Sequence, residues 1–386
     1  MSRLDERVER VSNVLGEYVA AGSIPGGIVL VSEGDEVRIA AEGMVGFESG
    51  DEPMRPDTLV RIASITKPIT AAAALQLVDE GRLSLDSPIE QWLPELQGAT
   101  VVRTPSSPVD DVVPVERKIT LHDLLTSRAG WGFPSDFTLP AVEALFAVQT
   151  DGRFPHAFPP ADSWLARLAE VPLVAQPGSS WLYDTSLTIL GILVERVSGR
   201  RLGEQFETSI FEPLGMTDTG FTLAAADIER FARLYQRDGD GALVEADDRA
   251  AWLTAPALEL GNGGLLGTVR DWWRFARMLL SGGEAPRGRL LSQHLVDEMV
   301  NNQISEHQMS AAALFLDGQG WGFGGSVDVH DIDPWNVPGR FGWVGGTGTS
   351  GHLVPSTGET TIVLTQVCAS EPGLLPIHRD IWTAAA

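Results

Sequence analysis

Polar and apolar residues follow regular patterns along both ends of this chain. Residues 1–22 alternate charged and apolar positions at helical spacing, which predicts an amphipathic helix. Two segments rich in valine and isoleucine follow, residues 26–35 and 36–51. They are separated by Gly-Asp turn chemistry and predict a β-hairpin. Residues 64–80 predict a helix with a serine at its N-cap and Gly81 as its stop.

The middle of the chain has a different pattern. Residues 82–260 alternate helical stretches with loops that contain proline, tryptophan and glycine. Strand signals return only at residues 319–329, 348–356 and 359–367, and residues 372–386 predict a closing helix. The simplest arrangement is a sheet built from both ends of the chain with a helical insertion between them.

This pattern predicts an α/β protein of the α+β type with two domains. The first, an α/β domain, would be discontinuous and comprise residues 1–75 and 261–386. The second, mainly helical, would comprise residues 76–260. A chain of 386 residues with 43% hydrophobic residues is long and apolar enough to bury a large core.

Composition and charge bear on the partners and the location expected for this chain. The formal net charge of −24 and a pI near 4.6 argue against nucleic acid and anionic membranes as partners, because both need basic surfaces. No apolar run approaches the ~20 residues of a membrane span, and no signal-like segment is recognisable at the start, so a cytoplasmic protein is expected. The single cysteine, Cys368, is expected to be a small core residue.

Lys67 is one of only two lysines in the chain, and it lies three residues after Ser64. This spacing places both side chains on one helical face, so the amine could act on the hydroxyl. Arginine could not serve, because it stays protonated, whereas a lysine becomes a base once its pKa falls. Taken alone, the S-x-x-K pattern is weak, and Ser64 as a helix cap beside a solvated Lys67 is the alternative.

Two further stretches carry candidate chemistry. Tyr183, one of three tyrosines, lies between a Pro-Gly turn and an apolar helix, where its phenol could face a cleft. The alternative is an aromatic anchor beneath that helix. At residues 342–350 a tryptophan precedes a glycine-rich turn, which would bring backbone N–H groups close to a ligand or form an ordinary hairpin turn.

Other catalytic motifs are missing from the sequence. It contains no H-E-x-x-H or C-x-x-C, and none of its seven histidines has metal-ligand spacing, so we expect no metal and no cofactor. The G-x-S-x-G elbow is also absent, which leaves Ser64 as the motif-supported nucleophile. The glycines at residues 261–267 predict a turn at the edge of a cleft rather than a phosphate cradle.

Together these stretches resemble a known superfamily. Ser64-Ile65-Thr66-Lys67, Tyr183 in "PGSSWLYDT" and "GWVGGTGTS" at residues 342–350 occur in the order found in serine β-lactamases and penicillin-binding proteins. The chain is most similar to class C β-lactamases and the related family VIII carboxylesterases. The resemblance implies a largely antiparallel sheet flanked by helices, a mainly helical lobe, and a site in the cleft between them.

The same resemblance implies roles for individual residues. Ser64 would be the nucleophile, and Lys67 and Tyr183 would share the role of base. The backbone N–H groups of Ser64 and of the Gly345-Gly346 turn would form the oxyanion hole, with either glycine as the donor.

The departures from the family pattern bear on the substrate. Thr185 replaces the asparagine of the Tyr-x-Asn motif, and Trp343 replaces the cation that receives a substrate carboxylate in β-lactamases. Trp343 would present an apolar face to an uncharged group. The aromatic stretch 131–160, which begins with Trp131, would line a hydrophobic entrance or pack on the helical lobe.

We therefore expect a serine carboxylesterase that cleaves small to medium uncharged esters through an acyl-serine intermediate. A β-lactamase, a D-amino-acid-specific peptidase or an acyltransferase of the same fold is the alternative, and a non-catalytic acyl-binding protein is a third hypothesis. The expected partner is a small-molecule ester, with no nucleic acid and no membrane, and the sequence gives no oligomeric state.

Overall fold

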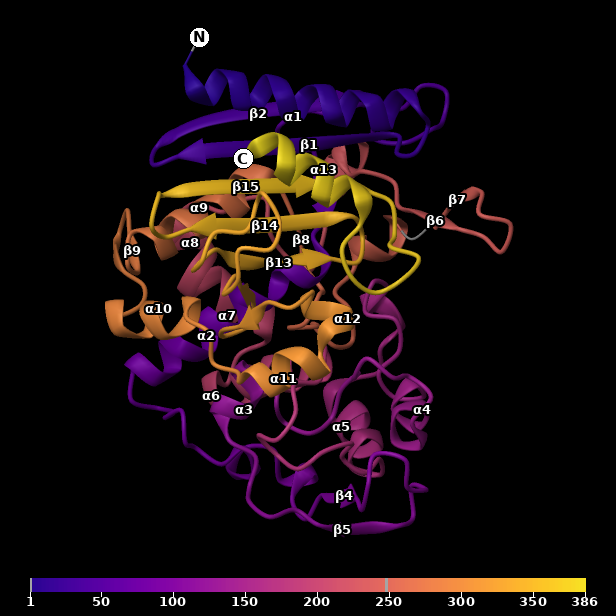
Figure 1. Cartoon of the computed structure of the whole chain (residues 1–386), viewed down its shortest axis with the longest axis vertical. Coiled ribbons are helices and arrows are strands. Elements are labelled where there is room, and N and C mark those ends of the chain that lie inside the picture. Colours follow the sequence, from indigo (N-terminus) through magenta and orange to yellow (C-terminus); the bar gives the residue numbers. More distant parts are fainter. Residues whose placement is uncertain (1, 247–248) are drawn as a thin grey trace.

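A seven-stranded antiparallel sheet forms one end of the molecule in the computed structural model, which describes residues 2–246 and 249–386 (Figure 1). Its strand order is β11-β12-β13-β14-β15-β1-β2. The strands are β1 (Gly26–Glu33), β2 (Glu36–Gly43), β11 (Gly320–Trp321), β12 (Ser326–Val327), β13 (Phe341–Gly345), β14 (Thr349–Val354) and β15 (Glu359–Leu364).

Both ends of the chain contribute to this sheet, as the hydrophobic pattern predicts. β1 pairs with β2 in the predicted hairpin, and its other edge pairs with β15, so that Ile28 lies opposite Leu364. The segments at residues 348–356 and 359–367 contain β14 and β15, and residues 319–329 contain the short strands β11 and β12. The centre of the sheet is thus made of residues more than three hundred positions apart in the sequence.

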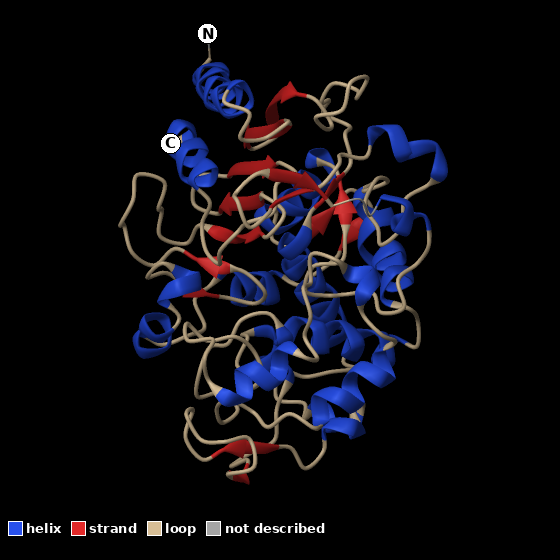
Figure 2. Ribbon diagram, turned by 90° about the vertical axis from the view of Figure 1, so that its right-hand side faces the viewer, coloured by secondary structure: helices blue, strands red, loops and turns tan. Residues whose placement is uncertain are grey.

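The sheet is buried on both faces because its strands are apolar on both faces. Val29 and Val31 of β1 pack in a cluster with apolar residues of α1 (Arg3–Ala20) and α13 (Pro376–Ala385). Ile28 and Leu30 point to the opposite side and join the main core, which includes residues of α9 (Val269–Leu280). The helices α1 and α13 therefore cover one face, and α9 covers the other (Figure 2).

The lower part of the molecule in Figure 1 is mainly helical, with α2 and α6 packed against each other in its core. Its helices, with those that connect it to the sheet, are α2 (Lys67–Asp79), α3 (Leu121–Leu125), α4 (Pro140–Phe146), α5 (Ala161–Ala169), α6 (Thr185–Ser198), α7 (Leu202–Phe206), α8 (Glu212–Leu214), α10 (Gln293–Val300), α11 (Glu306–Ala311) and α12 (Ala313–Leu316).

Short two-stranded ribbons complete the fold. They are β3 with β8 (Val60–Arg61, Leu266–Gly267), β4 with β5 (Thr100–Val102, Val112–Pro114), β6 with β7 (Tyr235–Arg237, Leu243–Glu245) and β9 with β10 (Glu284–Ala285, Gly288–Arg289). Tyr235 of β6 bridges to Val367 next to the sheet, so this part of the middle segment returns to the sheet end. The domain boundaries given above remain a prediction.

The predicted fold class is confirmed: a largely antiparallel sheet flanked by helices carries a mainly helical part. One element differs. The helix predicted over residues 64–80 begins with a 3-10 turn, Ala63–Thr66, and continues as α2, so Ser64 does not cap the helix with its side chain. Among the described residues, none of the helices has both the length and the hydropathy needed to cross a membrane.

Candidate active site

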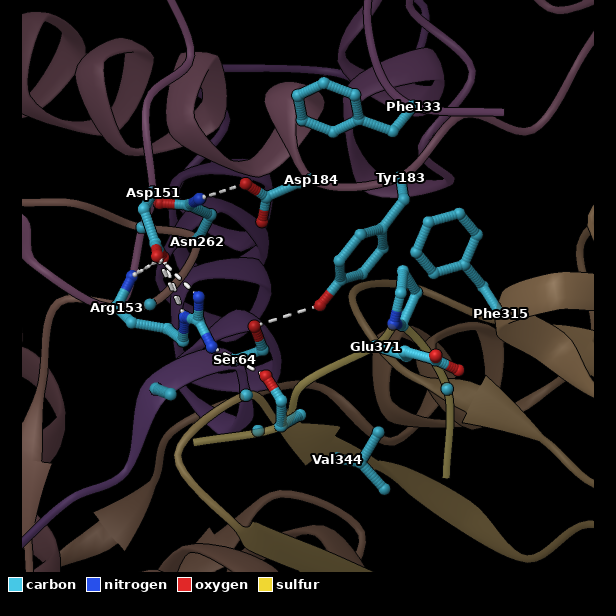
Figure 3. Close-up of a pocket in the computed structure, with 18 of the residues that line it drawn as sticks. Ser64, Phe133, Asp151, Arg153, Tyr183, Asp184, Asn262, Phe315, Val344 and Glu371 are labelled. Carbon is cyan, nitrogen blue, oxygen red and sulfur yellow. Dashed lines mark hydrogen bonds and ion pairs between the residues drawn. The ribbon is translucent and has the colours of Figure 1, made fainter. Parts of the chain in front are cut away.

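A cavity of about 580 Å³ lies where the sheet meets the helical part, and Ser64 is on its wall. Residues from both parts line it, and Figure 3 shows the Ser64 and Tyr183 hydroxyls pointing toward each other, with Asp184 hydrogen-bonded to Asn262 on the same side of the cavity. Its lining includes polar, aromatic and glycine residues: Ala63, Ser64, Phe133, Phe137, Phe146, Gln149, Asp151, Arg153, Tyr183, Asp184, Asn262, Phe315, Trp343, Gly345, Gly346 and Glu371.

Ser64 is held in a strained turn that is tied to the sheet. The preceding residue, Ala63, has φ +48°, a left-handed conformation that residues other than glycine rarely adopt. The hydroxyl of Thr349 donates to the carbonyl of Ile62 at 2.9 Å, and that of Thr347 donates to the carbonyl of Arg61 at 2.7 Å. Two threonines of the glycine-rich stretch thus fix the turn that presents Ser64.

Lys67 lies in the first turn of α2 and is completely buried. Its Nζ is 2.9 Å from Ser64 Oγ and 3.3 Å from the phenol oxygen of Tyr183. It also donates to Asp184 Oδ1 at 2.8 Å and to the carbonyl of Asn262 at 2.7 Å. The amine is therefore next to the serine, but it also forms an ion pair.

The ion pair reverses the expected direction of the Lys67 pKa. Burial alone would lower this pKa, because a charged amine loses hydration inside the protein. The negative charge of Asp184, with the hydrogen bonds from Lys67 to Asp184 and Tyr183, outweighs burial, and the pKa of Lys67 is raised. The lowered pKa that would make Lys67 a base is therefore not found in the resting site, where the raised pKa favours the ammonium form at neutral pH.

Tyr183 brings its phenol to the same point from the opposite wall. Its oxygen is 2.9 Å from Ser64 Oγ, and it accepts a hydrogen bond from Trp343 Nε1 at 3.0 Å. The ring stacks on Phe315 with a centroid separation of 4.7 Å. The structure thus brings Ser64, Lys67 and Tyr183 within hydrogen-bond distance of one another.

Asp184 was quoted in the sequence motif but given no role there. It follows Tyr183 directly and has φ +79° and ψ −60°, at the N-cap of α6. Its Oδ2 accepts hydrogen bonds from the side-chain amides of Asn262, at 2.8 Å, and Gln149, at 2.9 Å. Its side chain makes no capping hydrogen bond to α6, and its contact with Lys67 is visible only in the three-dimensional structure.

The candidate oxyanion donors line the cavity beside Ser64. Ser64 is the second residue of the 3-10 turn, where backbone N–H groups have no partner within the helix. Gly345 ends β13 and pairs with Thr349, whereas Gly346 is the first residue beyond the strand. The geometry therefore favours Gly346 over Gly345 as the second donor.

The three residues expected to bind substrate have different positions. Trp343 lines the cavity, but it is only 4% exposed and its indole nitrogen is bonded to Tyr183. Thr185 is fully buried in the first turn of α6 and is not on the cavity lining. Trp131 is also fully buried, and its indole N–H donates to the carbonyl of Val171. Neither Thr185 nor Trp131 meets a ligand in this cavity.

Aromatic rings form one wall of the cavity and charged groups lie on another. Phe133, Phe137 and Phe146, all from the aromatic stretch, contact one another, and Phe315 contacts Phe137. Across the cavity, Arg153 forms a two-point ion pair with Asp151 and donates to the carbonyl of Ala369 (Figure 3). The one cationic side chain on the lining is thus already neutralised.

Sequence reasoning missed Asp184, Asn262, Gln149 and Arg153. The segment of Asn262 was interpreted as a turn at the edge of a cleft, and both Asn262 and Gly263 do line the cavity.

Among residues 2–246 and 249–386, no cluster of histidine, cysteine, aspartate and glutamate side chains is arranged to hold a metal ion.

Comparison with known proteins shows which family the chain resembles over most of its length. A model of the family described as Beta-lactamase matches residues 11–379. Esterase EstB of Burkholderia gladioli is 32% identical over 92% of this chain and 89% of its own. Lovastatin esterase of Penicillium rubens is 31% identical over 85% of each chain. The solved structure of EstCE1, described as a hydrolase with promiscuous acyltransferase activity, has a TM-score of 0.81 at 23% identity and covers 99% of this chain and 98% of its own.

Proposed function

The chain belongs to the Beta-lactamase family, and on this premise we propose that it is a serine carboxylesterase, of the family VIII type, that hydrolyses small to medium uncharged esters. One observation carries the proposal. Ser64 Oγ lies 2.9 Å from both Lys67 Nζ and the Tyr183 oxygen on the wall of a cavity of about 580 Å³. A serine with two adjacent proton-transfer groups in an open cavity is suited to nucleophilic catalysis.

Acylation follows from these positions. Ser64 Oγ attacks the ester carbonyl carbon while its proton passes to the Lys67–Tyr183 pair. The carbonyl oxygen becomes an oxyanion that accepts the N–H groups of Ser64 and Gly346. The intermediate collapses, the bond to the alcohol oxygen breaks, and the pair returns the proton to that oxygen. The products are free alcohol and an ester between Ser64 and the acyl group.

Deacylation repeats the steps with water. Water attacks the acyl carbon and gives one proton to the same pair, and the second tetrahedral intermediate is bound by the same two N–H groups. When the bond to Ser64 Oγ breaks, the proton returns to the serine and the carboxylic acid leaves. Both half-reactions use the same residues.

The lining of the cavity supports an uncharged substrate. Asp151, Asp184 and Glu371 carry negative charge, and Arg153 is paired with Asp151. A substrate carboxylate, which β-lactams carry, would find no unpaired cation on the described lining. The phenylalanines instead offer apolar surface to an acyl chain.

The first test compares hydrolysis of p-nitrophenyl acetate, butyrate and octanoate with that of nitrocefin, using the wild type and Ser64→Ala. We expect ester turnover that falls by at least about 10⁴-fold in the variant, with little cleavage of nitrocefin. Mass spectrometry of the wild type quenched during turnover should find the acyl mass on the peptide containing Ser64.

Three results would overturn the proposal. Unchanged ester hydrolysis in Ser64→Ala would exclude this serine as nucleophile. Nitrocefin turnover equal to ester turnover would indicate a β-lactamase, and acylation without turnover would indicate an acyl-binding protein.

Acyl transfer is the second candidate, because the related EstCE1 is described as having that activity and the cavity is open to an alcohol in place of water. Adding 1-butanol to the p-nitrophenyl butyrate assay would distinguish the two. A transferase forms butyl butyrate at the expense of butyric acid, and a strict hydrolase does not.

The cytoplasmic location expected from the sequence stays a prediction.

A further inference from the structure

Asp184 has a backbone conformation that an aspartate adopts only under constraint. Its φ of +79° with ψ −60° lies outside the regions that L-residues normally occupy. Such a conformation persists where surrounding contacts determine it, and it is found most often at functional sites. The contacts of its side chain show which interaction the conformation serves.

Both carboxylate oxygens of Asp184 are engaged. Oδ1 binds Lys67 Nζ at 2.8 Å, while Oδ2 accepts the amides of Asn262 and Gln149. A carboxylate only accepts hydrogen bonds, so both amides must turn their NH₂ groups toward it. Both amides thus donate to Asp184, and their own buried carbonyl oxygens are left without a partner in the described part of the chain.

The hydrogens of Lys67 can be assigned in the same way. An ammonium group has three N–H bonds, and two of them point at groups that only accept, Asp184 Oδ1 and the carbonyl of Asn262. The third lies between Ser64 Oγ and the Tyr183 oxygen. Because Lys67 is fully buried, no water replaces these partners.

No other charged side chain meets Lys67 in the described site. The remaining charged groups on the cavity lining are Asp151, Arg153 and Glu371. Arg153 is bonded to Asp151 and to the carbonyl of Ala369, and no ion pair or hydrogen bond joins any of the three to Lys67. Asp184 is therefore the group that balances the charge of Lys67.

We propose that Asp184 is a positioning residue that keeps Lys67 as an ammonium group and aims its third N–H at the oxygens of Ser64 and Tyr183. With Lys67 charged, the Tyr183 oxygen, 2.9 Å from Ser64 Oγ, is the acceptor for the serine proton. The O–H bond of Ser64 breaks as a new O–H bond forms on the tyrosine oxygen, and the tyrosine passes its own proton to the leaving alcohol. This inference rests on the proposed esterase function for its kinetic part.

The protonation of Lys67 can be measured without any assay of activity. The chain has two lysines. Lys118 is 62% exposed and paired with Glu90, and neither residue is on the cavity lining. Lys118→Arg should leave activity unchanged and make Lys67 the only lysine. Labelling that variant with [ε-¹³C]lysine gives one side-chain NMR signal whose shift reports the ammonium or the amine.

We expect this signal to be that of an ammonium at neutral pH and to titrate above a free lysine, because the pKa of Lys67 is raised by Asp184. Adding Asp184→Asn should lower its titration midpoint, because burial then favours the neutral amine. Asp184→Gly provides a second variant, since glycine adopts a positive φ without strain. A neutral Lys67 near pH 7 in the presence of Asp184, or no change in midpoint in either variant, would overturn the inference.

Kinetics supply the second measurement. If the ammonium is the working form, the alkaline limb of kcat against pH should move to lower pH in Asp184→Asn. On that alkaline limb kcat should fall about 10- to 100-fold relative to the wild type, with KM within about threefold. A lower kcat with an unchanged pH profile would mean that Asp184 only supports the fold. A rise in activity with a shifted acid limb would make Lys67 the base. If the wild type lacks esterase activity altogether, the proposed function fails while the NMR titration still decides the role of Asp184.

Discussion

Two of the buried ion pairs in the described part of the chain differ in what surrounds them. Lys67 and Asp184 meet at 2.8 Å beside a cavity and next to two hydroxyl groups. Arg340 and Asp328 meet at 3.6 Å among aromatic residues, with the Arg340 guanidinium 4.4 Å from the ring centre of Trp382. The nearby cavities there measure only about 30 and 60 Å³.

The difference shows that a buried ion pair by itself indicates neither catalysis nor structure. Burial lowers the pKa of Arg340 to about 10, which still leaves a cation that cannot exchange protons at neutral pH. The second pair contacts no nucleophile, and two neutral histidines, His352 and His378, lie close to it. We therefore expect the first pair to matter for activity and the second for stability.

The largest effect expected from this comparison is on activity. Lys67→Met should lower kcat/KM for p-nitrophenyl butyrate by at least about 10⁴-fold, because it removes both the ammonium and its hydrogen bonds to Ser64 and Tyr183. Far-UV circular dichroism and thermal melting would establish the folded fraction. A folded variant that keeps a tenth of the activity would contradict a catalytic role for Lys67.

Arg340→Met is the matched substitution in the second pair. It leaves Asp328 buried without its partner, so we expect a loss of about 3–5 kcal/mol in unfolding free energy. The kcat/KM of the folded protein should stay within about threefold of the wild type. Urea denaturation and the esterase assay measure the two quantities, and a large loss of activity at unchanged stability would reverse the assignment.

Acid should weaken the second region. Burial lowers the pKa of His378 to about 4, whereas an unfolded histidine titrates near 6.5. Between these values the unfolded chain binds a proton that the folded chain does not, so stability present above pH 6.5 is lost as the pH falls toward 4. The loss should reach about 3 kcal/mol at most.

Melting temperatures from pH 7 to pH 4 would measure this loss. His378→Phe, which keeps a ring beside Trp382, should reduce the slope, while Arg340 and His352 remain in place. An unchanged slope in the variant would mean that the acid sensitivity arises elsewhere.

The smallest expected effect distinguishes two roles of Trp343, as a hydrogen-bond donor to Tyr183 and as an apolar surface for the substrate. Trp343→Phe keeps an aromatic face toward the cavity but removes the N–H that donates to Tyr183. We expect kcat to fall by a few-fold to about tenfold, the usual scale for the loss of one hydrogen bond, with KM nearly unchanged. A change confined to KM would favour the original interpretation of Trp343 as a substrate-binding surface.

The strands β1, β2, β14 and β15 of the sheet were predictable because each is marked by the residues of its own segment. A short apolar run followed by a Gly-Asp turn defines β1 and its hairpin with β2, and the late apolar runs define β14 and β15. The 3-10 turn at Ser64 was not predictable, since it depends on a left-handed Ala63 and on hydroxyls from Thr347 and Thr349. No pattern within residues 60–70 contains those partners.

The site was predicted only as far as motifs reach. Spacing and resemblance indicated Ser64, Lys67 and Tyr183, and the structure places them together. The charge of Lys67 depends on Asp184, whose side-chain direction follows from a backbone angle that sequence does not reveal. Thr185 was assigned to the substrate because motif position was taken as orientation, whereas that residue is fully buried in the first turn of α6.

The pairing of β1 with β15 also sets a condition for biosynthesis. β1 is apolar on both faces, and one of its edges is completed only by a strand about 330 residues later. At translation rates of roughly 5–20 residues per second, the N-terminal hairpin would leave the ribosome about 15–70 s before its partner strand exists. During that time its free edge is open to pairing with other nascent chains. Yield in a host cell should therefore depend on holdase chaperones and on growth temperature more than on the stability of the finished enzyme.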